Sequence, residues 1–89
     1  MKYIISEHTG LKPTIKRTKP VKIILKNNGP HRVWISLGAP AISLMGLFLD
    51  KDEEGVLTEE ATHIFLVCGK NQTSNVTSKK VLEKHQQGD

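Results

Sequence analysis

The acidic stretch that begins at Asp50 has the residue types of a calcium-binding loop. Carboxylates occupy its first, third and fifth positions, and a glycine, Gly55, occupies the sixth, which is the pattern by which such loops wrap one ion. The twelfth position should supply a bidentate glutamate, but this chain has Ala61 there. The residues on both sides also favour strands over the helices that flank such loops. The sequence therefore predicts a solvated acidic turn without a bound metal ion.

The single cysteine, Cys68, is the next candidate for chemistry. It lies in the apolar run 64–68, which predicts a buried small hydrophobic residue, and a lone cysteine has no partner for an internal disulfide. A blue-copper site would need a histidine and a methionine soon after the cysteine, whereas only one histidine follows and no methionine does. We expect no metal and no cofactor, because metal-ligand spacing is missing among the histidines His8, His31, His63 and His85.

No pattern in the sequence predicts catalysis. The acidic pairs Glu53-Glu54 and Glu59-Glu60 lack the apolar pocket that general acid–base work requires. A Ser/His/Asp set and a phosphate-binding glycine loop are both missing. We therefore expect a protein that is not an enzyme and has no catalytic residue.

The chain length and the net charge limit the number of domains and the kinds of partner that the protein can have. A chain of 89 residues forms one domain, and no apolar run approaches the roughly 18 residues of a membrane span. The first residues lack the apolar core of a signal peptide, so we expect the chain to stay in the cytoplasm unless it is packaged. The first 35 residues carry eight lysines or arginines against one acid, and the net charge is +4. Such a basic region suits a nucleic acid or an acidic surface of an identical subunit.

Two short runs in the first half of the chain alternate apolar and polar residues, as strands do. They are Val21–Lys26 and Arg32–Leu37, and the segment between them, Asn27–Pro30, favours a turn. The sequence therefore predicts a β-hairpin with one face in the core. The outer face of this hairpin is predicted to carry Ile24, Arg32 and Trp34.

Further short strands are predicted along the rest of the chain. A basic segment with two prolines, 11–20, is expected to be an extended arm or edge strand, and the polar run 79–89 is expected to be a C-terminal tail. The run 61–68 is apolar on both faces, which indicates a central and most buried strand. The remaining predicted strands are Tyr3–Ile5, Ile42–Leu49 with a bulge or bend at Gly46, Val56–Thr58 and Asn75–Thr77.

These elements predict an all-β fold. We expect a small antiparallel β-sandwich or flattened barrel of about six to eight short strands. One domain over residues 1–78 would include the basic N-terminal arm, and the polar tail would follow it.

Candidate binding residues follow from this arrangement. Trp34 and Arg32 share the predicted outer face, and such pairs occur at protein interfaces, while cover by another strand or the tail, or stacking on nucleic-acid bases, stays open. The basic arm could lie over a neighbouring subunit or contact phosphates. Its candidate contact residues are Lys12, Lys16, Arg17 and Lys19.

One longer pattern covers residues 19–77. It runs Lys-Ile-Ile-Leu-Lys-Asn-Asn-Gly, then Val-Trp-Ile-Ser-Leu-Gly, Gly-Leu-Phe-Leu, an acidic turn, and a closing strand that ends Asn-Val-Thr. This order resembles that of the small β-domain virion proteins of tailed bacteriophages.

The resemblance implies a capsid-decorating, head-fibre, neck or tail protein without enzymatic activity. It implies other virion proteins, such as the major capsid or a neck or tail protein, and copies of the same chain as partners, with no membrane. It also implies a place in the virion, and in the host cytoplasm before assembly. Alternatives are a small basic nucleic-acid-binding module or an inhibitor of a host protein.

Overall fold

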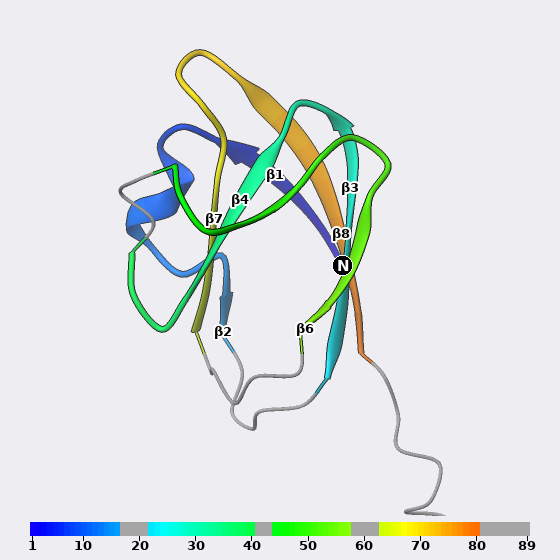
Figure 1. Ribbon diagram of the computed structural model, residues 1–89. Coiled ribbons are helices and arrows are strands. Elements are labelled where there is room, and N and C mark those ends of the chain that lie inside the picture. Colours follow the sequence, from blue (N-terminus) through cyan, green and yellow to red (C-terminus); the bar gives the residue numbers. More distant parts are fainter. Residues whose placement is uncertain (17–21, 41–43, 58–62, 81–89) are drawn as a thin grey trace, which may run out of the picture.

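A computed structural model describes residues 1–16, 22–40, 44–57 and 63–80, which form two four-stranded sheets (Figure 1). The strand order is β1-β8-β3-β6 in the first sheet and β2-β7-β4-β5 in the second, and the pairings are antiparallel. The predicted all-β antiparallel fold is therefore confirmed. The elements are β1 (Lys2–Ser6), the 3-10 helix η1 (Thr9–Leu11), β2 (Ile15–Lys16), β3 (Ile23–Pro30), β4 (Val33–Leu37), β5 (Leu47–Leu49), β6 (Glu54–Leu57), β7 (His63–Val67) and β8 (Thr73–Lys80).

The hydrophobic core lies between the two sheets and follows the alternation along the strands. In β3, Ile23 and Leu25 are buried, and in β4, Val33 and Ile35 are buried. The residues between them point to the outer surfaces, because successive side chains of a strand face opposite sides. Both sheets contribute to one cluster of buried residues: Ile5, Ile15, Ile23, Leu25, Val33, Ile35, Leu49, Leu57, Ile64, Leu66, Cys68 and Val76.

The strand β7 is central in the second sheet and is buried on both faces. Ile64 and Leu66 are 0% exposed and belong to the core between the sheets. Phe65 and Val67 point to the other face, yet they are only 5% and 4% exposed. The prediction that this segment is the most buried strand is confirmed.

The predicted hairpin is wrong. β3 pairs with β6 and β8 in the first sheet, whereas β4 pairs with β5 and β7 in the second. The chain therefore crosses from one sheet to the other at residues 31 and 32, as can be followed in Figure 1. The predicted inward and outward faces were nevertheless correct, because two strands that face each other across a sandwich need the same alternation as two strands side by side.

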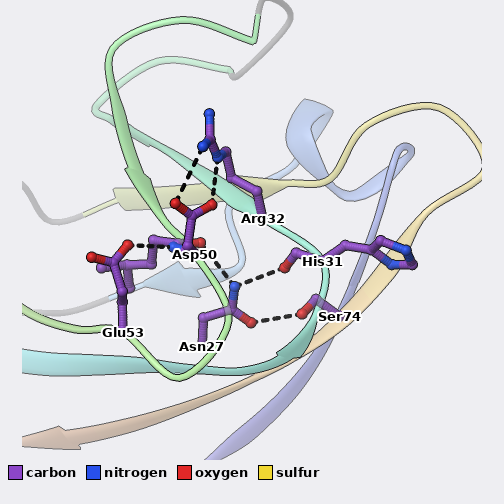
Figure 2. Close-up of polar contacts among 7 residues, drawn as sticks. Asn27, His31, Arg32, Asp50, Glu53 and Ser74 are labelled. Atoms are coloured by element: carbon purple, nitrogen blue, oxygen red, sulfur yellow. Dashed lines mark hydrogen bonds and ion pairs between the residues drawn. The ribbon is translucent and has the colours of Figure 1, made fainter.

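The segment Asn27–Pro30, predicted to be a turn, is the end of β3. The Asn27 side chain is 0% exposed, and Figure 2 shows it at the centre of a set of polar contacts. Its Nδ2 donates to the carbonyls of His31 at 2.7 Å and Leu49 at 2.8 Å. Its Oδ1 accepts from the backbone N–H of Gly29 at 2.9 Å and from Ser74 Oγ at 2.6 Å. The buried amide is fully hydrogen-bonded, as a polar group in a core must be.

Several predicted boundaries differ from the observed ones. β5 contains only Leu47–Leu49 of the predicted strand, because Gly46 before it has a φ of +87° and turns the chain there. The last strand continues to Lys80, so two lysines assigned to the tail are part of β8. The predicted arm contains the last residue of η1, Leu11, and the edge strand β2. The rest of the arm and tail, 17–20 and 81–89, lies outside the described residues, as do 41–43 and 58–62.

The acidic stretch forms a tight turn between β5 and β6. The backbone N–H of Asp50 donates to Glu53 Oε1 at 2.7 Å, and that of Glu53 donates to the Asp50 carbonyl at 3.0 Å. In the part of the chain that the structure describes, no group of three or more His, Cys, Asp or Glu side chains is placed to hold a metal ion. The same residues include no helix with the length and hydropathy to cross a membrane.

Candidate protein-binding face

The outer surface of the second sheet carries a row of aromatic and apolar side chains. β4 lies between β5 and β7, and the register places Trp34 opposite both Phe48 and Val67. The Trp34 and Phe48 rings are in contact, with centroids 5.1 Å apart and planes tilted by 58°. Trp34 also packs against the buried pair Phe65 and Val67. We call these four residues, together with Arg32, the aromatic face.

Arg32 is held over this surface by an acidic partner. Its Nε donates to Asp50 Oδ1 at 2.6 Å and its Nη2 donates to Asp50 Oδ2 at 3.2 Å (Figure 2). The guanidinium carbon lies 4.0 Å from the Phe48 ring centroid and 5.5 Å from that of Trp34. The hydrogen bond to Asp50 raises the pKa of Arg32. Two hydrogen bonds and two rings fix this guanidinium in one orientation before any partner arrives.

Exposed apolar residues also lie in and just before the edge strand β5, where Leu47 is paired with Ile35 and its side chain leaves the strand on the opposite side from Phe48. Phe48 and Leu47 both lie in the edge strand β5, and they are 41% and 51% exposed. Leu44 and Met45, just before that strand, are 46% and 75% exposed. We call Leu44, Met45 and Leu47 the apolar edge. Exposed apolar residues of this kind at a sheet edge are common at protein-binding sites.

The residue types on the aromatic face are those found at protein–protein interfaces. Tryptophan, phenylalanine and arginine are the residue types enriched at the centres of protein interfaces. Trp34, Phe48, Phe65 and Val67 lie on paired strands and Arg32 directly precedes β4, so the ladders of β4, β5 and β7 fix the backbone that presents this face. A partner that binds this surface therefore costs the domain little conformational entropy.

The predicted three-residue interface is split between the two sheets. Arg32 and Trp34 lie together on the aromatic face, as predicted. Ile24 belongs to β3, so it lies on the outer surface of the first sheet, opposite Lys79 and Val56. Its predicted position beside Trp34 was wrong, because that position required the hairpin that does not form.

The described lysines of the basic arm are exposed and lie in or before the edge strand β2, with two strands, β7 and β4, between β2 and Phe48 on β5. Lys16 is in β2, the edge strand at the far side of the second sheet from β5, and is exposed opposite His63. Lys12 is exposed in the segment before β2. The other two arm candidates, Arg17 and Lys19, lie outside the described residues.

Two features of the surface were not predicted. Phe48 was not predicted to join Trp34, and Asp50 was assigned to the solvated turn, because Arg32 and Asp50 are 18 positions apart and the sequence carries no local sign of a contact. The outer surface of the first sheet also gathers three exposed lysines, which the register places on neighbouring strands around Thr77 and Ile24: Lys2, Lys26 and Lys79. Because positions 2, 26 and 79 are far apart in the sequence, this group can be recognised only once the strand order is known.

Cys68 is a buried residue next to β7. It is 1% exposed and belongs to the core between the sheets. Burial raises the pKa of its thiol to about 11. The thiol is therefore protonated at neutral pH, and its predicted place as a small hydrophobic core residue is confirmed.

Comparisons of this chain with protein-family models, with curated proteins and with solved structures found no match.

Proposed function

We propose that this domain is a structural, protein-binding component of a tailed-phage particle. In this role it decorates the capsid or joins parts of the head, neck or tail, and it acts by binding another virion protein through the aromatic face. The observation that carries the proposal is the fixed stack of Arg32, Phe48 and Trp34 beside an exposed apolar edge.

The geometry supports protein binding for two reasons. An exposed phenylalanine and an arginine held by a carboxylate provide both apolar area and directed hydrogen-bond donors. The surface is also small, since it spans three short strands, β4, β5 and β7, of five, three and five residues. A small surface suits a component present in many copies, because repeated weak contacts add up to stable attachment.

The virion setting rests on the resemblance of the sequence to small β-domain virion proteins. The resemblance covers residues 19–77, from β3 into β8, and three of the strands within it, β4, β5 and β7, carry the aromatic face. A small all-β domain of two antiparallel sheets fits such a setting.

The test is co-sedimentation of purified protein with mature particles of the virus that encodes it, at low and high salt. Trp34→Ala should reduce the bound fraction at least about fivefold, since central aromatic residues contribute most of an interface's affinity. Ile24→Ala is the matched control, because Ile24 lies on the other sheet. Equal loss from both variants, or no loss from Trp34→Ala, would overturn the proposal.

A second candidate function is sequence-independent binding of nucleic acid. The lysines on the outer surface of the first sheet, Lys2, Lys26 and Lys79, support it, because lysine–phosphate contacts supply most non-specific affinity. A gel-shift titration with duplex DNA at several salt concentrations tests it. Binding that falls steeply with salt and is lost in Lys26→Glu, but not in Trp34→Ala, would favour this function.

A further inference from the structure

The first sheet ends in two strands that are paired on one side only. In the described residues β1 pairs with β8 alone and β6 pairs with β3 alone, so their outer edges are available to another strand. Natural proteins usually protect such edges, because an unpaired edge invites a further strand.

The backbone groups that face outward on β1 follow from its hydrogen bonds. The amino group of Met1 donates to the Ser78 carbonyl at 3.0 Å, and the N–H of Ser78 donates to the Met1 carbonyl at 2.8 Å. In an antiparallel ladder these mutual pairs recur at every second residue. The peptide groups of Lys2 and Ile4 therefore face away from β8. The far end of β1 is occupied, because the Ser6 carbonyl accepts from the N–H of Cys68 at 3.1 Å.

The same reasoning applies to β6. The N–H of Asn27 donates to the Glu53 carbonyl at 2.9 Å, so the next residue that bonds to β3 along this strand is Gly55. The peptide groups of Glu54 and Val56 therefore face away from β3. Each of the two edges thus offers the backbone groups of two residues, at the same spacing.

The side chains at these positions are complementary in charge and hydropathy. On β1, Lys2 is exposed and Ile4 is 75% exposed; on β6, Glu54 is exposed and Val56 is 55% exposed. One edge is therefore basic and apolar, and the other is acidic and apolar. All four side chains lie on the outer surface of the sheet.

The strand directions also fit. Three antiparallel pairings separate β1 from β6, so the two strands run in opposite directions within one copy. A second copy placed alongside in the same orientation brings its β1 antiparallel to β6. In this arrangement Val56 lies directly opposite Lys2 of the second copy, and Glu54 lies directly opposite Ile4 of the second copy. Glu54 is then the diagonal neighbour of the second copy's Lys2. Val56 is likewise the diagonal neighbour of the second copy's Ile4. Such diagonal neighbours are within reach of each other on one face of a sheet.

We propose that copies of this chain associate head to tail through their first sheets, with β6 of one copy pairing with β1 of the next. The contact is heterologous, so each added copy presents a new β6 and the assembly grows as a fibre or closes as a ring. This inference deepens the proposed cohesive function, on which its biological meaning rests. It uses a surface separate from the aromatic face, so the two can fail independently.

Sedimentation velocity of the purified protein over a range of concentrations tests the inference. We expect wild-type protein to form reversible oligomers. Glu54→Lys and Lys2→Glu should each raise the dissociation constant about tenfold, because each replaces an attraction by a repulsion. The double variant Lys2→Glu/Glu54→Lys should recover association. Lys70→Glu is the charge-matched control, since Lys70 is exposed in the turn before β8.

Val56→Pro tests the backbone pairing separately. Proline removes the outward-facing N–H that would bond to the second copy, while the bonds of β6 to β3 do not use it. We expect a folded monomer by circular dichroism. Wild-type protein that stays monomeric, single charge variants that associate like the wild type, or a double variant no better than the singles would each overturn the inference. Trp34→Ala should associate normally, which separates this result from a failure of the proposed function.

Discussion

The side-chain nitrogen of Asn27 donates a 2.8 Å hydrogen bond to the Leu49 carbonyl and thereby joins the first sheet to the second. Asn27 lies in β3 and Leu49 in β5, strands that belong to different sheets. The same amide also fixes the crossing at His31 and the neighbouring strand at Ser74. One buried side chain therefore holds together the end of the sandwich that carries Arg32 and Asp50.

Asn27→Ala should destabilise the domain strongly. It removes four hydrogen bonds at once, three of them buried, and each buried group left without its partner costs about 1–3 kcal/mol. We expect a fall of about 3–5 kcal/mol in the free energy of unfolding, measured by urea denaturation. Asn28→Ala is the control, since Asn28 is exposed and makes only a 3.4 Å contact with Thr77. If Asn27→Ala does not fold, Ser74→Ala should still lower the free energy of unfolding by about 1–2 kcal/mol. Equally small losses of unfolding free energy in all three variants would show that the Asn27 hydrogen bonds do not stabilise the fold.

Gly29 should be intolerant of a side chain for two separable reasons. Its φ is +88°, and an added Cβ would lie 2.7 Å from Lys51 Cγ. Gly38 shares the first property, with a φ of +79°, but has nothing within 4 Å of an added Cβ. Gly38→Ala should therefore cost about 1 kcal/mol for the backbone alone, and Gly29→Ala clearly more by thermal denaturation. Lys51→Ala in the Gly29→Ala background should recover the difference; no recovery would mean that Lys51 is not the obstacle.

Cys68 should react slowly with thiol reagents in the folded protein. Its pKa is raised from 9.0 to about 11 by burial, which alone lowers the thiolate fraction about 100-fold at pH 8. We expect labelling at pH 8 to be at least about 100-fold slower in buffer than in concentrated urea. Fast labelling in buffer, at a rate close to that in urea, would show that the β7 end of the core opens readily.

The same thiol should make the domain less stable in alkali. The folded state keeps the Cys68 proton up to about pH 11 whereas the unfolded chain loses it near pH 9.0, so stability is complete below pH 9 and falls between the two values. The loss attributable to this group is on the order of 2 kcal/mol. Urea denaturation of wild type and Cys68→Ala at several pH values measures it. The difference in unfolding free energy between the two proteins should shrink above pH 9; a constant difference would contradict the prediction.

Arg32→Lys should weaken partner binding although the charge is kept. Lysine cannot make the two parallel hydrogen bonds to Asp50 or lie flat on Phe48 as the guanidinium does. We expect about a tenfold loss of affinity for particles in the co-sedimentation titration, similar to that of Arg32→Ala. Retained binding in Arg32→Lys would show that only the positive charge matters.

The alternation of apolar residues predicted the faces of the strands but not their neighbours. Ile23, Leu25, Val33 and Ile35 are buried as predicted, because burial depends only on local period. Whether β3 and β4 share a sheet depends on the Asn27 amide, whose partners lie 4, 22 and 47 residues away. No local pattern carries such information.

The candidate site was predicted only in part for the same reason. Arg32 directly precedes β4 and Trp34 is two positions further along, so their shared face followed from the alternation of an extended backbone. Phe48 and Asp50 join them through the β4–β5 pairing, and Ile24 leaves them because β3 is in the other sheet. The exposed edges of β1 and β6 likewise became visible only when the strand order was known.

The pairing of β1 with β8 has a consequence for synthesis. Lys2 lies opposite Thr77, so β1 has no neighbour in its sheet until β8 has been translated. The first sheet therefore closes only after nearly all of the described chain has left the ribosome, and β1 has no strand partner in that sheet for the whole interval. A chain whose contacts are this distant in sequence folds slowly compared with one that pairs neighbours. A truncated product that stops before Thr73 would lack the strand between β1 and β3, and a separately supplied β8 peptide would be the piece to restore it by complementation.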